Sequence, residues 1–186
     1  MHTAYVHFFA CRARIAMRAA PILAALFLIG GCASPLTQEG MVPTGMVINK
    51  KHHETVRVAV SGGSETSERL AISNASLEAA LNQTINESRL FSQVVKGNGG
   101  DYLLTANLFS MDQPMFGMAM TVKLEAGWTL KRASDSKIVW QEAIWSEHTS
   151  TPGEAFAGVT RVRLATEGAV KNNIAEALSK IATLPL

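Results

Sequence analysis

The chain has 186 residues, of which 47% are hydrophobic and 17% are charged. Lys and Arg together number 17, Asp and Glu number 15, and the formal net charge is +2. A balance this close to zero argues against nucleic-acid binding, which needs a clustered basic face. Both cysteines lie near the amino terminus, at positions 11 and 32, so the sequence predicts no disulfide in the domain that follows.

Residues 1–31 have the features of a bacterial signal peptide. The apolar run at 19–31 contains Pro21 and is shorter than the roughly 20 residues that a spanning helix needs. Met17 offers an alternative start close to this run. Positive charge ahead of a short apolar run is typical of a secretory signal, and the basic residues here are Arg12, Arg14 and Arg18.

The tripeptide Ile29-Gly30-Gly31 stands directly before Cys32 and reads as a lipobox. Small residues suit signal-peptidase cleavage, and the following thiol offers a point for lipid attachment. Cleavage there leaves 155 residues that begin at Cys32, with 14 basic residues against 15 acidic ones. We expect a diacylglycerol and an N-linked acyl chain such as palmitate on Cys32, because two or more acyl chains give durable membrane attachment.

Residues 32–55 are rich in proline, glycine and small polar residues, which predicts a flexible tether after the acylated cysteine. A tether of this length would reach roughly 25–30 Å. The apolar triplet at 46–48 leaves a second interpretation open, in which an edge strand shortens the tether. The remaining residues, 56–186, are predicted to form a single globular domain.

Residues 56–60 alternate valine with other residues and predict a short strand that ends at Ser61-Gly62-Gly63. The next element is a helix predicted over residues 74–91, because Leu77, Leu81 and Ile85 recur every four residues. Ser73 or Asn74 can cap its first turn.

A strand-like run follows at 102–109, and residues 118–130 alternate strictly between apolar and polar side chains, which predicts a long half-buried strand. A polar turn leads to a second long strand at 138–150, with a bulge expected near Glu142. The chain closes with a helix predicted over 160–183, in which Gly168 indicates close packing.

This order of elements predicts an α+β two-layer sandwich. Each helix has one apolar stripe and the long hairpin has one apolar face, so two helices should cover one side of the sheet. The first strand, helix and second strand should form a crossover with parallel strands. We therefore expect a mixed, mainly antiparallel sheet of about four strands.

Residues that could carry chemistry are scattered. Ser61 stands between a strand and two glycines, but no nucleophile elbow, phosphate-binding loop or dinucleotide motif is present. His52, His53, Glu54 and His148 lack the spacing of a metal site. The acidic residues fall at predicted turns and strand ends, where they serve as ordinary polar residues: Asp101, Asp112, Asp135, Glu142, Glu147 and Glu154.

Two apolar clusters near residue 115 remain. Soft thioethers can bind Cu(I), although methionines also fill gaps in cores, and four lie close together: Met111, Met115, Met118 and Met120. Exposed apolar patches often mark contacts with protein or lipid, and the candidate partner patch consists of Phe109, Pro114, Met115 and Phe116. The alternative is that this patch folds back over the core.

The lipobox at 29–32, the tether and the pattern of elements over 56–182 resemble small outer-membrane lipoproteins of the YajG kind. They are more distantly similar to the envelope lipoproteins LptE and LpoB. The resemblance implies a non-enzymatic envelope accessory protein without a cofactor, and Ala33 after the acylated cysteine resembles an outer-membrane sorting signal. The inner membrane is the alternative location.

Three functions follow as hypotheses: an interaction module that binds an envelope partner through a sheet edge or the Met115–Phe116 region, a periplasmic lipid or glycolipid carrier, and a hydrolase whose site is assembled from distant residues.

Overall fold

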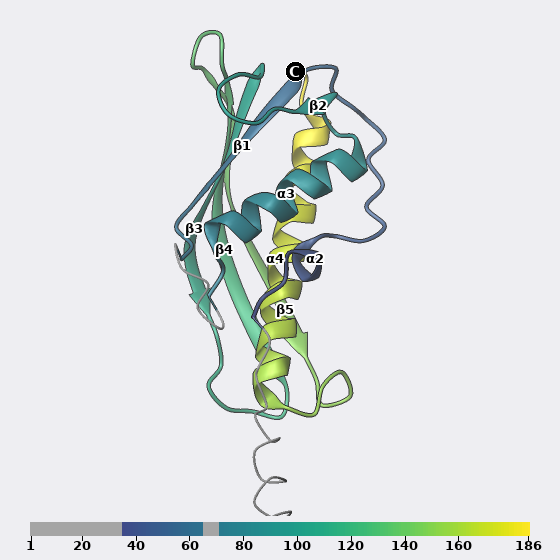
Figure 1. Cartoon of the computed structure of the whole chain (residues 1–186), viewed down its shortest axis with the longest axis vertical. Coiled ribbons are helices and arrows are strands. Elements are labelled where there is room, and N and C mark those ends of the chain that lie inside the picture. Colours follow the sequence, from purple (N-terminus) through teal and green to yellow (C-terminus); the bar gives the residue numbers. More distant parts are fainter. Residues whose placement is uncertain (1–34, 65–70) are drawn as a thin grey trace, which may run out of the picture. The chain divides into compact units, whose positions relative to one another are not determined.

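The computed structural model describes residues 35–64 and 71–186, so the signal peptide and the lipobox lie outside the described residues. Residues Ala33–Leu186 form one compact unit, separate from Met1–Cys32. Its elements, coloured along the chain in Figure 1, are α2 (Gln38–Met41), β1 (Thr55–Ser61), α3 (Asn74–Ser88), β2 (Gln93–Val94), β3 (Tyr102–Asp112), β4 (Met120–Arg132), β5 (Ile138–Ser150) and α4 (Gly158–Thr183).

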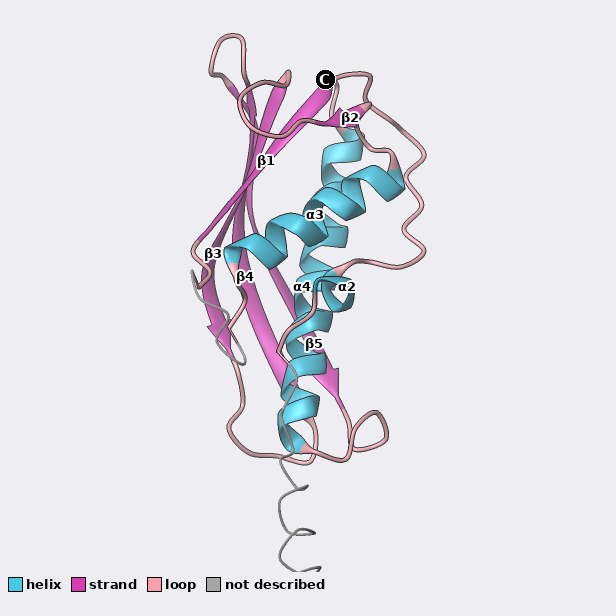
Figure 2. Cartoon of the chain, in the orientation of Figure 1, coloured by secondary structure: helices cyan, strands magenta, loops and turns pink. Residues whose placement is uncertain are grey.

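The sheet has five strands in the order β2-β1-β3-β4-β5. Strand β1 runs parallel to both β2 and β3, whereas β3, β4 and β5 pair antiparallel. The helices lie on one side of this sheet (Figure 2). The predicted α+β two-layer sandwich is confirmed, with one strand more than expected because the two-residue β2 adds to the outer edge of β1.

The core lies between the helices and the sheet. Every second residue of β4 from Met120 to Leu130 is buried, as the alternation predicts. The indole of Trp128, in the middle of this face, donates to Asn173 Oδ1 of α4 over 2.8 Å. Asn173 also donates to the carbonyl of Ile144 over 2.9 Å, so a buried amide joins α4 to both strands of the hairpin.

Helix α3 begins as predicted, with Ser73 Oγ accepting from the amide of Ser76. It ends at Ser88, three residues earlier than expected, because Arg89 adopts a left-handed backbone with φ of 54°. This turn sends Leu90 and Phe91 into the core.

Helix α4 packs closely on β5. A Cβ atom on Gly168 would lie 2.2 Å from the ring of His148, so the expected close approach is present. The predicted bulge near Glu142 is displaced: the register shifts where Leu130 pairs with Trp140 and Lys131 with Ile138, which leaves Val139 as the extra residue.

The prediction of a flexible tether over 32–55 is wrong for most of that segment. Residues 38–41 form α2, and the side chains of Met41, Val42 and Ile48 are buried in the core. Thr37 donates to Glu167 of α4 through its amide and its hydroxyl. The apolar side chains of this segment find partners on α3 and α4, and the compact unit begins near residue 33 instead of 56.

Candidate functional site

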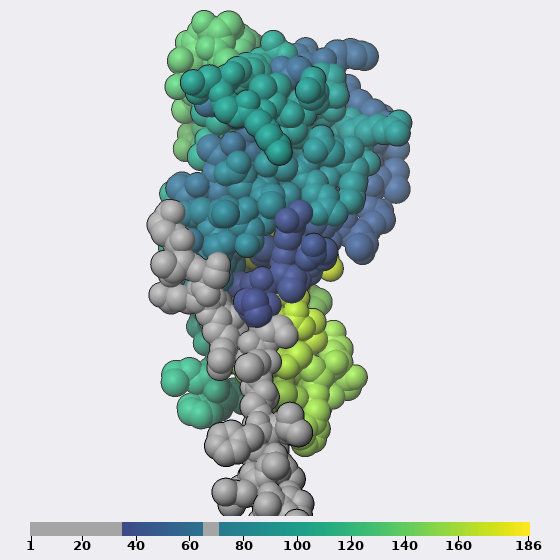
Figure 3. All heavy atoms as spheres, viewed as in Figure 1, coloured from purple at the N-terminus to yellow at the C-terminus, as the bar shows by residue number. Residues whose placement is uncertain are grey.

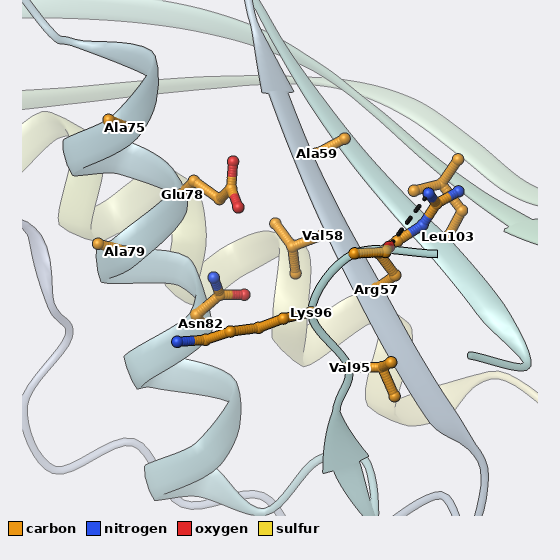
Figure 4. Close-up of a pocket in the computed structure, with 11 residues that line it drawn as sticks. Arg57, Val58, Ala59, Ala75, Glu78, Ala79, Asn82, Val95, Lys96 and Leu103 are labelled. Carbon is orange, nitrogen blue, oxygen red and sulfur yellow. Dashed lines mark hydrogen bonds between the residues drawn. The ribbon is translucent and has the colours of Figure 1, made fainter. Parts of the chain in front are cut away.

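A groove of about 610 Å³ lies between α3 and the edge of β1. Figure 4 shows Glu78 and Asn82 extending from α3 toward β1, with Lys96 reaching across from the loop after β2. The other residues of α3 that line the groove are Ala75, one turn before Glu78, and Ala79, between Glu78 and Asn82. Small residues on one wall leave room for side chains that a bound segment would bring.

The other wall of the groove is an open sheet edge. β2 pairs with β1 only at Thr55 and Val56. The carbonyl of Val56 accepts from Val95 over 2.8 Å and therefore faces the β2 side. Because the direction of backbone groups alternates along a strand, Val58 and Val60 present their N–H and C=O groups to the same side, beyond the end of β2.

Two polar atoms beside the groove are buried without a hydrogen-bond partner among residues 35–64 and 71–186. They are Asn82 Oδ1 on α3 and Arg57 Nε on β1. The Nη1 atom of Arg57 donates to the carbonyl of Gly97 over 3.4 Å. Leaving a buried polar atom unpaired costs about 1–3 kcal/mol, so a ligand that donates to Asn82 would recover part of that energy.

The opposite edge of the sheet belongs to β5, and two of its carbonyls accept side-chain amides from α4. Asn172 donates to the carbonyl of Glu147, and Asn173 donates to that of Ile144, both over 2.9 Å. Because these carbonyls are three residues apart, they face opposite sides of β5, and only one of them lies on the outer edge. The β1 edge differs from the β5 edge because it faces the groove along α3.

The predicted partner patch is divided by the structure. Met115 and Phe116, in the β3–β4 loop, are 83% and 86% exposed, and Pro114 beside them is half-buried. Phe109 lies elsewhere, on the sheet face away from the helices, where its ring crosses Gly127. Regular alternation from the buried Leu104 and Ala106 already places Phe109 on that face, and the β-bulge at this residue changes only the direction of the residues that follow it.

The β5–α4 loop, and not Phe109, lies beside the loop that carries Met115 and Phe116. The guanidinium of Arg161, at the start of α4, donates to the carbonyls of Ala155 and Phe156 in the β5–α4 loop and to Gly117 in the β3–β4 loop. Both loops lie at the same end of the domain (Figure 3). The exposed side chains that they and the first turn of α4 present, here called the apolar end, are Met115, Phe116, Met118, Phe156 and Val159.

The four methionines considered for copper have different surroundings. Met120 is buried in the core, Met111 is half-buried with its sulfur near the Gln113 amide, and Met115 and Met118 are exposed. The expectation that Met118 belongs to the alternating face of the strand is wrong, because β4 begins only at Met120. No group of three or more His, Cys, Asp or Glu side chains that could hold a metal occurs among the described residues.

The histidines and Ser61 have structural surroundings. His52 is buried, bonded through Nε2 to the carbonyl of Ile181 and tilted against the ring of Phe91. Ser61 donates to Asn107 Oδ1, and the adjoining Gly62 has a φ of +82° and packs directly on the β3 backbone. The Ser61–Gly63 segment is therefore a tight strand exit.

Carboxylates with a lowered pKa serve turns and strand ends. Thr55 donates its amide and hydroxyl to Asp101, which lowers the pKa of that carboxyl. The amide of Thr151 lowers the pKa of Glu154, and nearby His148 contributes in the same direction. These groups hold the backbone in place, which agrees with their interpretation as ordinary polar residues.

Sequence reasoning missed the groove, Phe156 and Glu167. Glu167 is 4% exposed, accepts hydrogen bonds from Thr37, and forms an ion pair with Arg163, with 3.0 Å between Nη1 and Oε1. An acidic residue at a position facing the core of an amphipathic helix was the available signal. The residues that line the groove, and the two loops that meet at Phe156, come from segments far apart in sequence, and no local pattern reveals that they lie together.

The class that these features define is a two-layer α+β domain with an open sheet edge beside β1. No protein-family model and no curated protein matches the sequence. Among solved structures, protein XCC0632 from Xanthomonas campestris, of the DUF330 family, is 13% identical, with a TM-score of 0.56 over 80% of this chain and 92% of that one.

Other similar structures include lipoproteins. The minor lipoprotein from Acinetobacter baumannii is 7% identical, with a TM-score of 0.46 over 70% of this chain and 93% of that one. PelC from Paraburkholderia phytofirmans, solved as a dodecamer, is 14% identical, with a TM-score of 0.48 over 74% of this chain and 92% of that one. At these identities the likeness concerns the fold.

Proposed function

We propose that the protein is a lipoprotein of the bacterial cell envelope, cleaved before Cys32 and held at the periplasmic face of the outer membrane by acyl chains. The basic and apolar leader and the lipobox at 29–32 support this proposal. Within residues 35–64 and 71–186, no helix has both the length and the apolar character needed to cross a bilayer.

We further propose that the domain is a non-enzymatic interaction module for envelope assembly, maintenance or transport, and that it binds an extended segment of a partner protein beside β1. The observation that carries this proposal is the unpaired edge of β1 beyond β2, which faces the groove along α3 at Val58 and continues to Val60. An added strand would gain main-chain hydrogen bonds from this edge and side-chain contacts from the alanines of α3.

The lining of the groove favours this function over a lipid carrier. Glu78 and Lys96 place opposite charges at the groove, and the orphaned Asn82 Oδ1 adds a polar acceptor. Acyl chains bind in apolar cavities, where unpaired polar groups are costly. A peptide supplies amide donors and charged side chains that match this lining.

The anchor is tested by Cys32→Ser. The variant should leave the membrane fraction while its domain keeps the circular dichroism and melting temperature of the parent. Unchanged membrane fractionation would overturn the anchor.

The groove is tested by a matched pair at Val60, combined with a photocrosslinking residue at position 79. Val60→Pro removes an N–H on the open edge, whereas Val60→Ala keeps the N–H and loses similar packing. Crosslinking to a defined partner in intact cells should be lost in the proline variant and kept in the alanine variant. Equal crosslinking in both variants would refute strand addition at β1, and a crosslinker at exposed Asn86 controls for proximity alone.

A further inference from the structure

The apolar end is unusually exposed for a surface built from large apolar side chains. Phe156 is 97% exposed, Phe116 86% and Met118 76%, although they belong to two loops separated in sequence. Arg161, only 8% exposed, fixes both loops through their carbonyl oxygens. The side chains are therefore presented outward from a tied backbone, and an apolar patch of this kind marks a contact surface.

The described chain is fixed on α4 only a few residues after Cys32. Thr37 is held on Glu167 by two hydrogen bonds of 2.9 and 3.1 Å. Four residues lie between Cys32 and Thr37, which makes five steps along the chain, and a fully extended chain spans at most about 3.6 Å per step. The linkage from Thr37 to the proposed anchor can therefore span at most roughly 18 Å, which is shorter than a tether of 24 residues would reach.

Helix geometry places the apolar end within the same reach. Glu167 is nine residues after Gly158, the first residue of α4, which corresponds to about 14 Å along the helix axis. Val159 lies in that first turn, and Phe156 lies just before it. An acyl chain on Cys32 and the apolar end can thus reach one and the same bilayer.

We propose that the apolar end inserts into the membrane interface beside the lipid anchor, so that the domain stands on the bilayer in a fixed orientation. This inference rests on the proposed function, which supplies the anchor at Cys32. The occupant is a lipid surface and not a partner protein, because the short linkage to Cys32 holds these side chains at the bilayer.

Charge near the apolar end indicates which lipids it needs. Arg161 is buried and committed to loop carbonyls. The exposed charges nearby have both signs, since Asp112 and Glu154 are acidic and Lys123 pairs with Asp112 in the sheet. Insertion should therefore depend on apolar burial and should be as strong in zwitterionic as in anionic membranes, with little effect of salt.

The inserted orientation also positions the groove. Strand β4 has 13 residues, so its far end and the following turn lie roughly 40 Å from the apolar end. Thr55 and Val56, at the start of β1, lie toward that far end, because β3 pairs Tyr102 with both Val56 and Arg132. The groove would stand away from the bilayer, open to the periplasm.

The test uses residues 33–186, which form a compact unit containing all the described core and neither cysteine. An amino-terminal hexahistidine tag holds it on zwitterionic vesicles that contain a nickel-chelating lipid. A single cysteine, either Ala119→Cys in the β3–β4 loop or Ser134→Cys in the far turn, carries an environment-sensitive dye. Emission at 119 should shift to the blue and be quenched by spin-labelled lipids, whereas emission at 134 should do neither.

Phe116→Asp combined with Phe156→Asp should abolish the shift at 119, and Val47→Asp, which alters a lone exposed valine, should leave it unchanged. Equal emission at the two positions, or a shift that survives the double variant, would overturn the inference. A shift that occurs without vesicles as protein concentration rises would assign the surface to a second copy instead. Because the tag replaces the acyl chains, an unmodified Cys32 would defeat the proposed anchor without deciding this measurement.

Discussion

Replacing Glu167 tests how the amino-terminal segment is held. Glu167→Ala removes the acceptor of two Thr37 hydrogen bonds and the partner of Arg163. Hydrogen bonds to a charged group contribute about 1.5–3 kcal/mol each, but desolvation of the buried carboxylate offsets part of this. We expect a net loss of about 2–4 kcal/mol in the free energy of unfolding.

For a domain of this size, 1 kcal/mol corresponds to about 2–4 °C in melting temperature, so Glu167→Ala should melt roughly 5–15 °C below the parent. Residues 35–45 should also lose protection from hydrogen exchange, because Thr37 no longer holds them on α4. Thermal unfolding followed by circular dichroism, and hydrogen exchange followed by mass spectrometry, measure the two effects in the 33–186 unit.

Two further variants sharpen this test. Gly40→Ala should act in the same direction, since its Cβ would lie 2.3 Å from Glu167 Cδ and displace the carboxylate. Glu39→Ala removes an exposed acidic side chain from the same short helix and serves as the control. If Glu167→Ala melts with the control and residues 35–45 stay protected, the segment is held by other contacts and the short linkage to Cys32 loses its basis.

Gly168→Ala should destabilise the domain by about 1–3 kcal/mol despite the better helix propensity of alanine, because the new methyl group meets the His148 ring. Combining it with His148→Ala should restore the free energy of unfolding measured in urea. A single variant as stable as the parent would contradict the close packing. Leu81→Asp places a carboxylate at a fully buried position and should leave no folded protein by circular dichroism, so a folded variant would refute the orientation of α3. Asp101→Asn tests the pH dependence of stability. Hydrogen bonds from Thr55 lower the pKa of Asp101 in the folded state below its ordinary value of 3.8. The ionised carboxylate therefore stabilises the fold at neutral pH, and this contribution is lost as the pH falls through the lowered pKa. The parent should therefore lose more stability than Asp101→Asn on acidification below about pH 4, and parallel acid unfolding curves would contradict the assignment.

Periodic patterns that extend over ten or more residues were sufficient to predict the two layers of the fold. The alternation in β4 and the four-residue spacing of Leu77, Leu81 and Ile85 reflect one buried face each, and both are confirmed. Strand β2 was missed because two residues carry no periodicity. The segment at 38–53 was misread because its buried residues are spaced irregularly among prolines and glycines, and its docking depends on Glu167, about 130 positions away.

The candidate surfaces were less predictable for the same reason. Met115 and Phe116 were identified from a local apolar cluster, but their companion Phe156 follows after the whole β4–β5 hairpin and is joined to them through Arg161. Phe109 lies on the opposite sheet face because it alternates with the buried residues Leu104 and Ala106 of β3, so the strand pattern itself separates it from Met115 and Phe116. The groove needs a free strand edge and a helix wall, and neither is a property of one segment.

Mass spectrometry of the protein purified from its native membranes tests the central claim most directly. We expect the mature chain to begin at Cys32, with a diacylglycerol on the sulfur and an acyl chain on the amino group. A free thiol at Cys32, or a chain that retains the leader ahead of it, would contradict the assignment of this protein as a lipid-anchored component of the cell envelope.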